Sequence, residues 1–424
     1  MISASSHLPY GTSPPAHWGV LPLKHLSTLS NGFAFKSDSW EDSGTPILRI
    51  ENLNGSSRFN YSTLALNERY KVTSGDLLYS WSGNPGTSFG PFRWAGDGTY
   101  YLNQHIFKVS VQGCDTGWLY WSLRAATHWI ERELTSGMIG MVHVTKDELG
   151  RVPIPLPPPE EQRRIADFLD AETARIDRIL TLKNSVQMQL VERVRSVRDG
   201  LVNRLSGSEA SVPLRRFITR IEQGASPQCE ASPREGEDEW AVLKLSSVKN
   251  GTFHPGENKR LPDGGQFSSL NEVRAGDLLV TRANTPSLVG DVAVVGEKPQ
   301  SRLLLPDLIY RVGLIGEIEA EYVAQIALSG RIRSLIESVA RGTSQSMVKL
   351  RGEDIKEWPI PITTLPRQAE LVKEIAEAAD TATSLQRITE RQVKLLAERR
   401  QALITAAVTG QIDVSTASGR GIEE

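Results

Sequence analysis

The chain has 424 residues, of which 39% are hydrophobic and 23% are charged, and its formal net charge is −2 at pH 7. This length favours two or three domains over a single core, and the composition excludes a disordered or fibrous protein. No apolar run approaches the roughly 20 residues that a membrane span needs, and Met1 to Pro15 lacks the pattern of a secretory signal. With only Cys114 and Cys229, we expect a cytoplasmic protein without disulfides.

Five short segments recur in the same order in the two halves of the chain. The offset between the copies rises slowly, as insertions in loops would make it do. Five pairs in register predict two similar domains, because a stacked solenoid needs at least three repeats. The pairs are Leu21–Lys24 with Val212–Arg215, Pro46–Ile50 with Ala241–Leu245, Val72–Leu78 with Val273–Leu279, Leu102–Val109 with Leu305–Val312, and Met141–Pro155 with Met347–Pro361.

Each copy has the pattern of a β-rich globule. Short β-branched and aromatic runs are broken by Gly, Asn and Pro clusters such as Ser82–Gly86. One helical segment is predicted late in each copy, at Trp118–Leu134 and at Glu319–Ala340. Both segments are amphipathic enough to cover a sheet.

A long helix is predicted after the first copy. The prolines from Pro153 to Pro159 predict an extended lead-in. Glu160–Gln162 then opens a segment without Gly or Pro until Gly200, and acidic residues in a first turn favour a helix start. Alternate steps of four and three residues from Leu169 predict a heptad seam that is polar in its middle. Its members are Leu169, Thr173, Ile176, Leu180, Lys183, Gln187, Leu190, Val194, Val197 and Leu201.

A second long helix is predicted after the second copy, from Pro366–Gln368 onward. Each helix of 35 to 40 residues would be roughly 50 to 60 Å long, and each has one apolar stripe that needs a partner. Dimerisation or simple scaffolding would use such helices, and so would a spacer that fixes the distance between two globules. The second seam is Leu371, Ile375, Ala378, Ala382, Leu385, Leu396 and Leu403.

Several segments together resemble the specificity (S) subunits of Type I restriction-modification systems. They are Pro15–Trp18 with Leu21–Leu23, the Gly-Asp-Leu-Leu of each copy, Val152–Pro157 with Glu161–Ala166, and Leu403–Gly410. The similarity covers nearly the entire chain, and the Pro-Ile-Pro…Glu-Gln junction is its most specific part. The second junction departs from the pattern, because Arg367 precedes Gln368 where the first has Glu161.

The resemblance implies a non-catalytic subunit that binds double-stranded DNA. Each recognition domain would read one half of an asymmetric bipartite site. The helices would pack as an antiparallel coiled coil, set the gap between the half-sites and dock two methyltransferase (M) subunits, which restriction (R) subunits would join. The chain itself would need no cofactor, because S-adenosylmethionine, ATP and Mg would belong to the partner subunits.

The repeat and the resemblance together predict an α+β fold with two tandem β-rich target-recognition domains, each followed by a long helix. The predicted segments are 1–157 for the first domain, 158–207 for the central spacer helix, 208–364 for the second domain, 365–412 for the C-terminal spacer helix and 413–424 for a flexible tail. The near-neutral charge suggests that partners supply many of the phosphate contacts, which dominate affinity.

Candidates for DNA contact are side chains with forked donors or acceptors in loops or at strand ends. The alternative for each is an ordinary surface residue or, for Trp81, a core aromatic. The first-domain candidates are Lys36, Arg49, Trp81, Asn84, Arg93 and Gln104. The second-domain candidates are Lys244, Arg282, Asn284 and Gln345.

Catalytic patterns are weak throughout. Gly86–Gly90 fits the G-x-S-x-G nucleophile elbow, but Pro91–Trp94 follows where a helix should start. The histidines show no metal-ligand spacing, and no P-loop is present. We therefore expect no catalytic residue and no metal site. Two alternatives stay open: a scaffold of two β-rich modules without nucleic acid, and a DNA reader in another methylation-based defence system.

Overall fold

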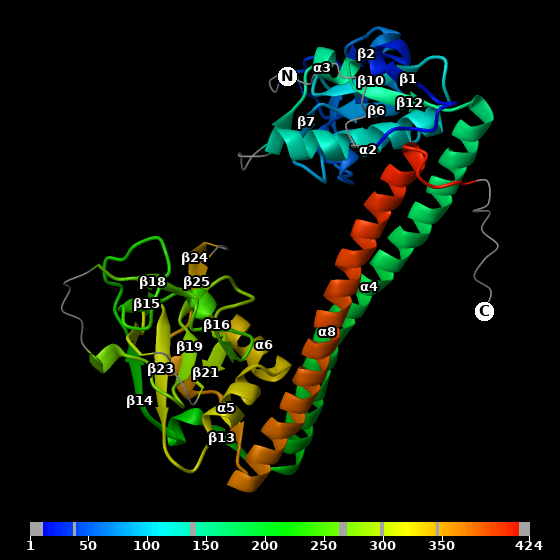
Figure 1. The fold of residues 1–424 in the computed structure, drawn as a ribbon. Helices are drawn as coiled ribbons and strands as arrows, with labels where there is room; N and C mark the ends of the chain where they lie inside the picture. Colours follow the sequence, from blue (N-terminus) through cyan, green and yellow to red (C-terminus); the bar gives the residue numbers. More distant parts are fainter. Residues whose placement is uncertain are drawn as a thin grey trace. The chain divides into compact units, whose positions relative to one another are not determined.

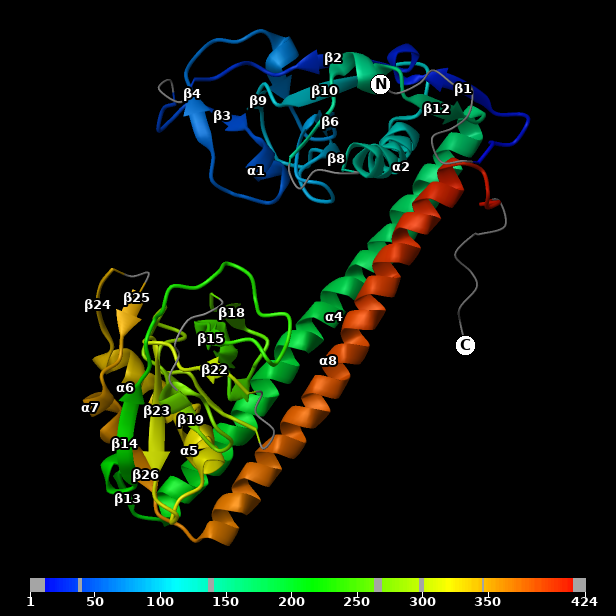
Figure 2. The same cartoon turned by 60° about the vertical axis from the view of Figure 1, so that its left-hand side comes forward.

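The computed structural model describes residues 12–36, 40–135, 141–262, 269–296, 301–344 and 347–414. The chain folds as two compact units (Figures 1 and 2). Unit 1 comprises Met1–Lys183 and Arg391–Glu424, and unit 2 comprises Asn184–Glu390. Each unit thus holds one β-rich globule with part of each long helix. The domain boundaries expected from the sequence, which give each helix a segment of its own, stay a prediction.

The described part of unit 1 is built around two four-stranded sheets, in the orders β2-β10-β6-β8 and β4-β3-β9-β5. Strand pairs β1-β12 and β11-β7 accompany them. The strands are β1 (Gly19–Pro22), β2 (Ser27–Asn31), β3 (Thr45–Leu48), β4 (Asn60–Ser62), β5 (Lys71–Val72), β6 (Leu77–Ser80), β7 (Ser82–Gly83), β8 (Gly90–Arg93), β9 (Tyr100–Leu102), β10 (Ile106–Val111), β11 (Val142–His143) and β12 (Pro153–Leu156).

Unit 2 repeats this arrangement with a four-stranded sheet in the order β14-β23-β19-β21, three-stranded sheets β18-β15-β22 and β20-β25-β24, and pairs β13-β26 and β16-β17. The strands are β13 (Ser211–Pro213), β14 (Ile218–Gln223), β15 (Ala241–Leu243), β16 (Val248–Lys249), β17 (Thr252–Phe253), β18 (Asn258–Arg260), β19 (Leu278–Thr281), β20 (Ala283–Asn284), β21 (Val292–Val294), β22 (Leu303–Leu304), β23 (Ile309–Leu314), β24 (Arg341–Ser344), β25 (Met347–Lys349) and β26 (Pro359–Pro361).

Corresponding sheets of unit 1 and unit 2 share strand pairings. In the main sheets, β10 pairs antiparallel with β2 and β6, as β23 does with β14 and β19. The pairs β3-β9 and β15-β22 are both parallel. This correspondence confirms that the sequence repeat is a repeat of the fold.

The recurring Gly-Asp-Leu-Leu segment has a structural explanation. The Asp76 carboxylate accepts a hydrogen bond from the Thr73 backbone N–H at 2.8 Å and pairs with Lys108 of β10 at 2.8 Å. In unit 2, Asp277 accepts from the Arg274 backbone N–H at 2.8 Å and pairs with Arg311 of β23 at 3.3 Å. The preceding glycines have φ near +90° and +80°, which a turn into the strand requires. The segment therefore specifies a turn and an ion pair.

Helices cover the sheets and link the repeats (Figure 1). They are α1 (Ile50–Leu53), α2 (Thr116–Thr135), α3 (Lys146–Gly150), α4 (Pro159–Ser208), α5 (Ala320–Ala327), α6 (Gly330–Val339), α7 (Gly352–Lys356) and α8 (Leu365–Val408). The 3-10 turns are η1 (Leu23–His25), η3 (Glu68–Tyr70), η4 (Leu214–Arg216), η5 (Leu245–Ser247) and η6 (Ser269–Asn271). The long helices α4 and α8 confirm that a helix follows each repeat.

Two helix expectations were wrong in detail. The single segment predicted over Glu319–Ala340 is two helices, because Ser329 is extended (φ −68°, ψ 149°) and ends α5 before α6 begins at Gly330. Pro159, expected in the extended lead-in, is instead the first residue of α4. Proline is compatible with a first helical position, where its missing N–H has no helical partner.

In unit 1 the two long helices run antiparallel. Lys183 of α4 donates to the Gln392 amide of α8 at 2.7 Å, and Arg400 donates to Asp177 at 3.2 Å. All ten predicted seam residues of α4 are buried or half-buried. The α8 seam departs from its prediction at one position, because Leu385 is 44% exposed while the next residue, Gln386, is half-buried. The positions that follow Ala382 at intervals of seven, from Thr389 to Leu403, stay buried or half-buried.

Candidate nucleic-acid interface

The loop that follows β6 in unit 1 is anchored by Trp81. The Trp81 indole N–H donates to the backbone oxygen of Gln104 at 3.0 Å, and its backbone N–H donates to that of His105 at 3.3 Å. The Trp81 ring stacks on Phe107 of β10 at a centroid distance of 5.9 Å. Trp81 is therefore partly the core aromatic that the sequence left as an alternative.

Arg282 anchors the corresponding loop of unit 2. Its guanidinium donates to the backbone oxygen of Asp307 at 3.4 Å and lies 6.0 Å from the Tyr310 ring centroid. Its backbone N–H donates to the Leu308 oxygen at 2.8 Å. Two predicted candidates of different chemistry thus occupy one position of the repeated fold.

The loops that accept these hydrogen bonds, before β10 in unit 1 and before β23 in unit 2, each lie against a glycine that follows the neighbouring strand β2 or β14. A Cβ added at Gly32 would lie 2.2 Å from the Asn103 backbone oxygen, and one added at Gly224 would lie 1.7 Å from that of Leu305. Both distances are far below van der Waals contact, so only glycine lets the loops approach this closely. The position of the loop is thus built into both repeats.

Three further side chains gather around Trp81. His105 and His143 lie 5.4 and 6.2 Å from its ring, and both are exposed. The Gln104 amide nitrogen lies 3.4 Å from the His105 ring nitrogen. Its amide oxygen is buried and has no hydrogen-bond partner among the described residues. Gln104 was predicted, whereas the two histidines were missed. We call Trp81, Gln104, His105 and His143 the aromatic cluster.

Unit 2 places a charged set at the equivalent loops. Lys349 of β25 is exposed and pairs in register with Ala283 of β20, next to Arg282. Asp307 is anchored beneath Arg282, and its carboxylate accepts from the Ser226 hydroxyl. We call Arg282, Asp307 and Lys349 the charged cluster. Lys349 corresponds to His143 in the alignment of the two repeats. A position-by-position comparison of the repeats could therefore have identified both residues.

The two predicted asparagines are not equivalent. The Asn84 backbone oxygen accepts from the N–H groups of Ser88 and Phe89, and that of Thr285 accepts from those of Leu288 and Val289. Asn84 therefore corresponds to Thr285. Asn284 lies one residue earlier, half-buried in β20, where its side-chain oxygen accepts from the Thr285 backbone N–H at 2.9 Å. Asn84 is exposed at its loop.

The other predicted residues lie apart from these clusters or have structural partners. Arg93 donates to both Asp170 oxygens at 2.8 and 2.9 Å and lies 4.2 Å from the Tyr120 ring, so it ties β8 to α4. Arg49 pairs with Glu51 at 2.9 Å. Lys244 lies 3.9 Å from Glu257.

Two candidates remain to be placed. Lys36 is exposed after Phe35, and Gln345 lies outside the described residues. A role in DNA contact stays a prediction for all ten candidates.

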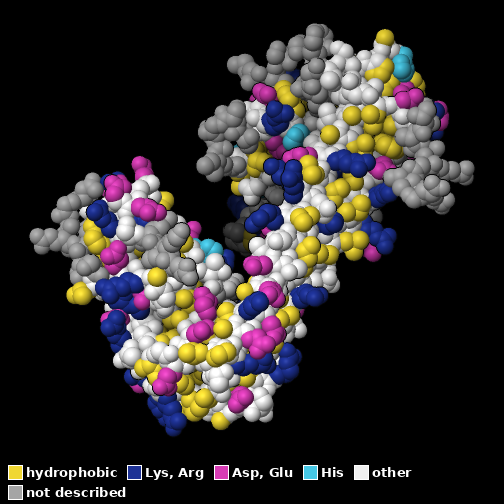
Figure 3. Space-filling view, turned by 60° about the horizontal axis from the view of Figure 1, so that its bottom comes forward, with side chains coloured by type: hydrophobic (Ala, Val, Ile, Leu, Met, Phe, Trp, Pro, Cys, Tyr) yellow, Lys and Arg dark blue, Asp and Glu magenta, His cyan; other side chains and the backbone are white. Residues whose placement is uncertain are grey.

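The charge distribution matches the near-neutral composition. On the face of unit 2 in Figure 3, Lys and Arg side chains are interspersed with Asp and Glu. No group of three or more metal-ligating side chains occurs among the residues that the structure describes. Within the same described ranges, no helix is long and apolar enough to cross a membrane.

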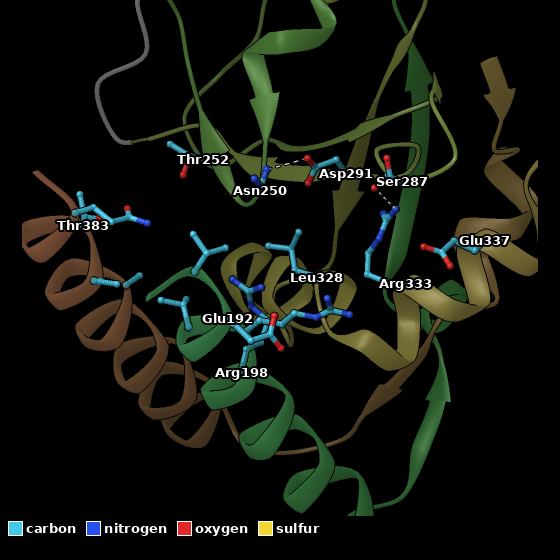
Figure 4. Close-up of a pocket in the computed structure, with 16 residues that line it drawn as sticks. Glu192, Arg198, Asn250, Thr252, Ser287, Asp291, Leu328, Arg333, Glu337 and Thr383 are labelled. Carbon is cyan, nitrogen blue, oxygen red and sulfur yellow. Dashed lines mark hydrogen bonds between the residues drawn. The ribbon is translucent and has the colours of Figure 1, made fainter. Parts of the chain in front are cut away.

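Unit 2 also contains a cavity of about 540 Å³ between α4, α8 and the globule (Figure 4). Burial lowers the pKa of Arg198 and raises that of Asp291. Arg333 donates to backbone oxygens of Val289 and Ser287. Three arginines in the lining face three carboxylates, so the cavity favours neither an anion nor a cation. The six are Arg195, Arg198, Arg333, Glu192, Asp291 and Glu337.

Known proteins share this architecture. A chain from a solved structure described as "Structural basis underlying complex assembly and conformational transition of the type I R-M system" superimposes with a TM-score of 0.68 at 15% identity, covering 95% of this chain and 100% of that one. At this identity, the likeness establishes the fold: a tandem repeat of β-rich units with long helices.

The sequences are more specific. Residues 15–188 match the family model of the Type I restriction modification DNA specificity domain. The chain is 32% identical over 162 residues to the EcoEI specificity subunit of Escherichia coli, across 38% of this chain but 27% of that subunit. It is 22% identical to the EcoKI specificity subunit of E. coli K12, across 94% of this chain and 90% of that one.

The chain is similar to the family of specificity subunits of Type I restriction-modification systems, through the specificity domain at residues 15–188 and at low identity over most of its length. Members of this family are the non-catalytic subunits of their complexes, and other subunits carry out the chemistry. This similarity confirms the resemblance expected from the sequence.

Proposed function

We propose that this chain selects the DNA sequence for a Type I restriction-modification complex, with each unit reading one half of an asymmetric bipartite site. The observation that carries this is the aromatic cluster of unit 1 and the charged cluster of unit 2. They occupy equivalent loops of one repeated fold but offer different chemistry. A shared framework with different side chains is what two readers of different half-sites require.

The long helices are proposed to form an antiparallel coiled coil that sets the gap between the half-sites and docks two methyltransferase subunits, with restriction subunits joining them. The antiparallel contacts of Lys183 and Arg400 support this packing in unit 1. S-adenosylmethionine, ATP and Mg would be bound by those partners. The interspersed charges of Figure 3 agree with partners that share the phosphate contacts.

The buried amide oxygen of Gln104, which has no hydrogen-bond partner within the described ranges, supports base readout by unit 1. Buried polar atoms without a partner are rare, because leaving one unpaired costs about 1 to 3 kcal/mol. A small movement on binding would let this oxygen accept a hydrogen bond from an exocyclic amino group of adenine or cytosine. A DNA base is thus a partner that would satisfy this atom.

Methylome sequencing tests the proposal. A host that expresses the methyltransferase subunits of the same system is compared with and without the gene for this chain. We expect methylation at one bipartite motif to disappear when the gene is removed and to return when it is restored. An unchanged methylome in a host that expresses the full system would contradict the proposal.

A further inference from the structure

The start of α4 is fixed to unit 1 by one buried glutamine. Gln162 is 2% exposed. Its side-chain oxygen accepts from the Asp115 backbone N–H at 2.7 Å, just before α2 begins, and its amide nitrogen donates to the Pro157 backbone oxygen at 2.7 Å. Beside it, the Trp118 indole N–H donates to the Pro155 oxygen of β12 at 3.2 Å. One amide therefore joins the spacer, the preceding strand and the covering helix.

The start of α8 repeats these contacts in unit 2. Gln368 is also 2% exposed. Its side-chain oxygen accepts from the Glu319 backbone N–H at 3.0 Å, just before α5, and its amide nitrogen donates to the Thr363 oxygen at 3.0 Å. The Tyr322 hydroxyl donates to the Pro361 oxygen of β26 at 2.8 Å. We call each set of contacts between a globule and the start of its long helix a joint. In both joints the glutamine amide nitrogen donates to the carbonyl five residues earlier.

The surroundings of the two glutamines differ, although the joints are alike. The residue before the glutamine is Glu161 in one copy and Arg367 in the other. Glu161 accepts from the Trp18 indole at 3.1 Å, whereas Arg367 pairs with Glu370 of its own helix. The hydrogen bonds of the joint thus persist while the neighbouring side chains change charge and partner. The joint therefore depends on the glutamine itself and not on the residue that precedes it.

We propose that Gln162 and Gln368 are positioning residues. Each fixes the angle between a β-rich globule and the long helix that follows it, and together they hold the gap between half-sites to a single length. The proposal rests on the proposed function. A buried amide with its hydrogen bonds satisfied on two sides is geometrically specific, because any tilt of the helix would break one of them. Half-site spacing follows the geometry of the protein that carries the readers. A looser joint would therefore tolerate neighbouring gap lengths while each unit kept its own sequence preference.

The test uses the complete methyltransferase complex with Gln162→Leu and Gln368→Leu. The matched control is Gln112→Leu, an exposed glutamine whose side chain donates only to the Thr28 hydroxyl among described residues. Methylation is sequenced across a library in which both half-sites are kept and the gap varies by one base pair. We expect the preference for the cognate gap to fall about tenfold in either joint variant, which equals about 1.4 kcal/mol. The wild type and the control should keep it.

Gln162→Asn and Gln368→Asn serve if the leucine variants fail to fold. They keep the amide but are one methylene too short to span both partners, and they should also loosen the gap. A uniform loss of methylation at every gap length, or an unchanged preference in a folded variant, would overturn the proposal.

Hydrogen exchange separates this proposal from the function on which it rests. The amides of Asp115 and Glu319 should be protected in the wild type and in Gln112→Leu, and each should exchange faster in the variant of its own joint. Faster exchange without a change in gap would overturn the positioning role. A wild-type complex that methylates no bipartite site would instead overturn the proposed function, whatever the exchange data show.

Discussion

The β-rich globules of unit 1 and unit 2 are alike at the start of the long helix that follows each of them, and they differ in their exposed loops. In each joint a glutamine accepts from the backbone N–H that precedes a helix and donates to the carbonyl five residues earlier, and Gln368 also donates to the Glu317 oxygen at 3.3 Å. At the loops, an indole in one unit and a guanidinium in the other anchor equivalent carbonyls. The repeat therefore supplies an internal control for each position, because the joints are alike in the two copies while the loop side chains differ.

The two units also differ in the ion pair of the Gly-Asp-Leu-Leu turn. The Arg311 side chain is 6% exposed and contacts Glu222 at 2.7 Å and Asp277 at 3.3 Å. In unit 1, Lys108 is 24% exposed and pairs with Asp76 alone among the described acids. Removing one partner of a buried pair leaves an uncompensated charge, at a cost of about 3 to 5 kcal/mol. A partly exposed pair costs less.

Arg311→Met should therefore destabilise unit 2 by about 3 to 5 kcal/mol, and Lys108→Met should destabilise unit 1 by clearly less. Hydrogen exchange followed by mass spectrometry measures this, because β19 and β23 report on one unit while β6 and β10 report on the other. Equal losses in the two units would show that depth of burial does not distinguish the pairs.

A smaller effect is expected from the hydrogen bonds beside the joints. Tyr322→Phe leaves the Pro361 carbonyl without its donor, and Trp118→Phe does the same for Pro155 while also removing ring volume. We expect about 1 kcal/mol for the tyrosine variant and about 2 to 3 kcal/mol for the tryptophan variant. Chemical denaturation monitored by exchange within each unit provides the measurement. A larger loss at Tyr322 would mean that the hydrogen bond outweighs the packing.

Much of the fold could be predicted from the sequence, because periodic spacing of apolar and polar residues determines it. The repeat, the β-rich globules and the two long helices all follow from spacing and residue type. The break at Ser329 could not, since an amphipathic stripe continues across it and the Gly330 N–H bonds to Asp199 far away in the chain. The exposure of Leu385 could not be predicted either, since steps of three and four residues connect Ala382 to Thr389 equally well through Leu385 or through Gln386.

The candidate interface was predicted less well. Residue type suggested Trp81 and Arg282 but could not reveal that both also anchor loops. Arg93 has the chemistry of a base reader, yet its ion pair with Asp170 ties β8 to α4. His143 and Lys349 were missed because each was considered alone, although the repeat aligns them. Comparing the copies position by position is the signal that single residues lack.

The central claim is that each unit reads its own half-site, and paired variants test it most directly. Trp81→Phe removes the indole donor that positions the loop of the aromatic cluster, and Arg282→Met removes the guanidinium of the charged cluster. Methylation would be sequenced on a library with both half-sites randomised and the gap fixed. Each variant should relax one half-site by about 1 to 3 kcal/mol per altered base pair and leave the other unchanged. Loss of methylation spread evenly over both half-sites in either variant would contradict the account.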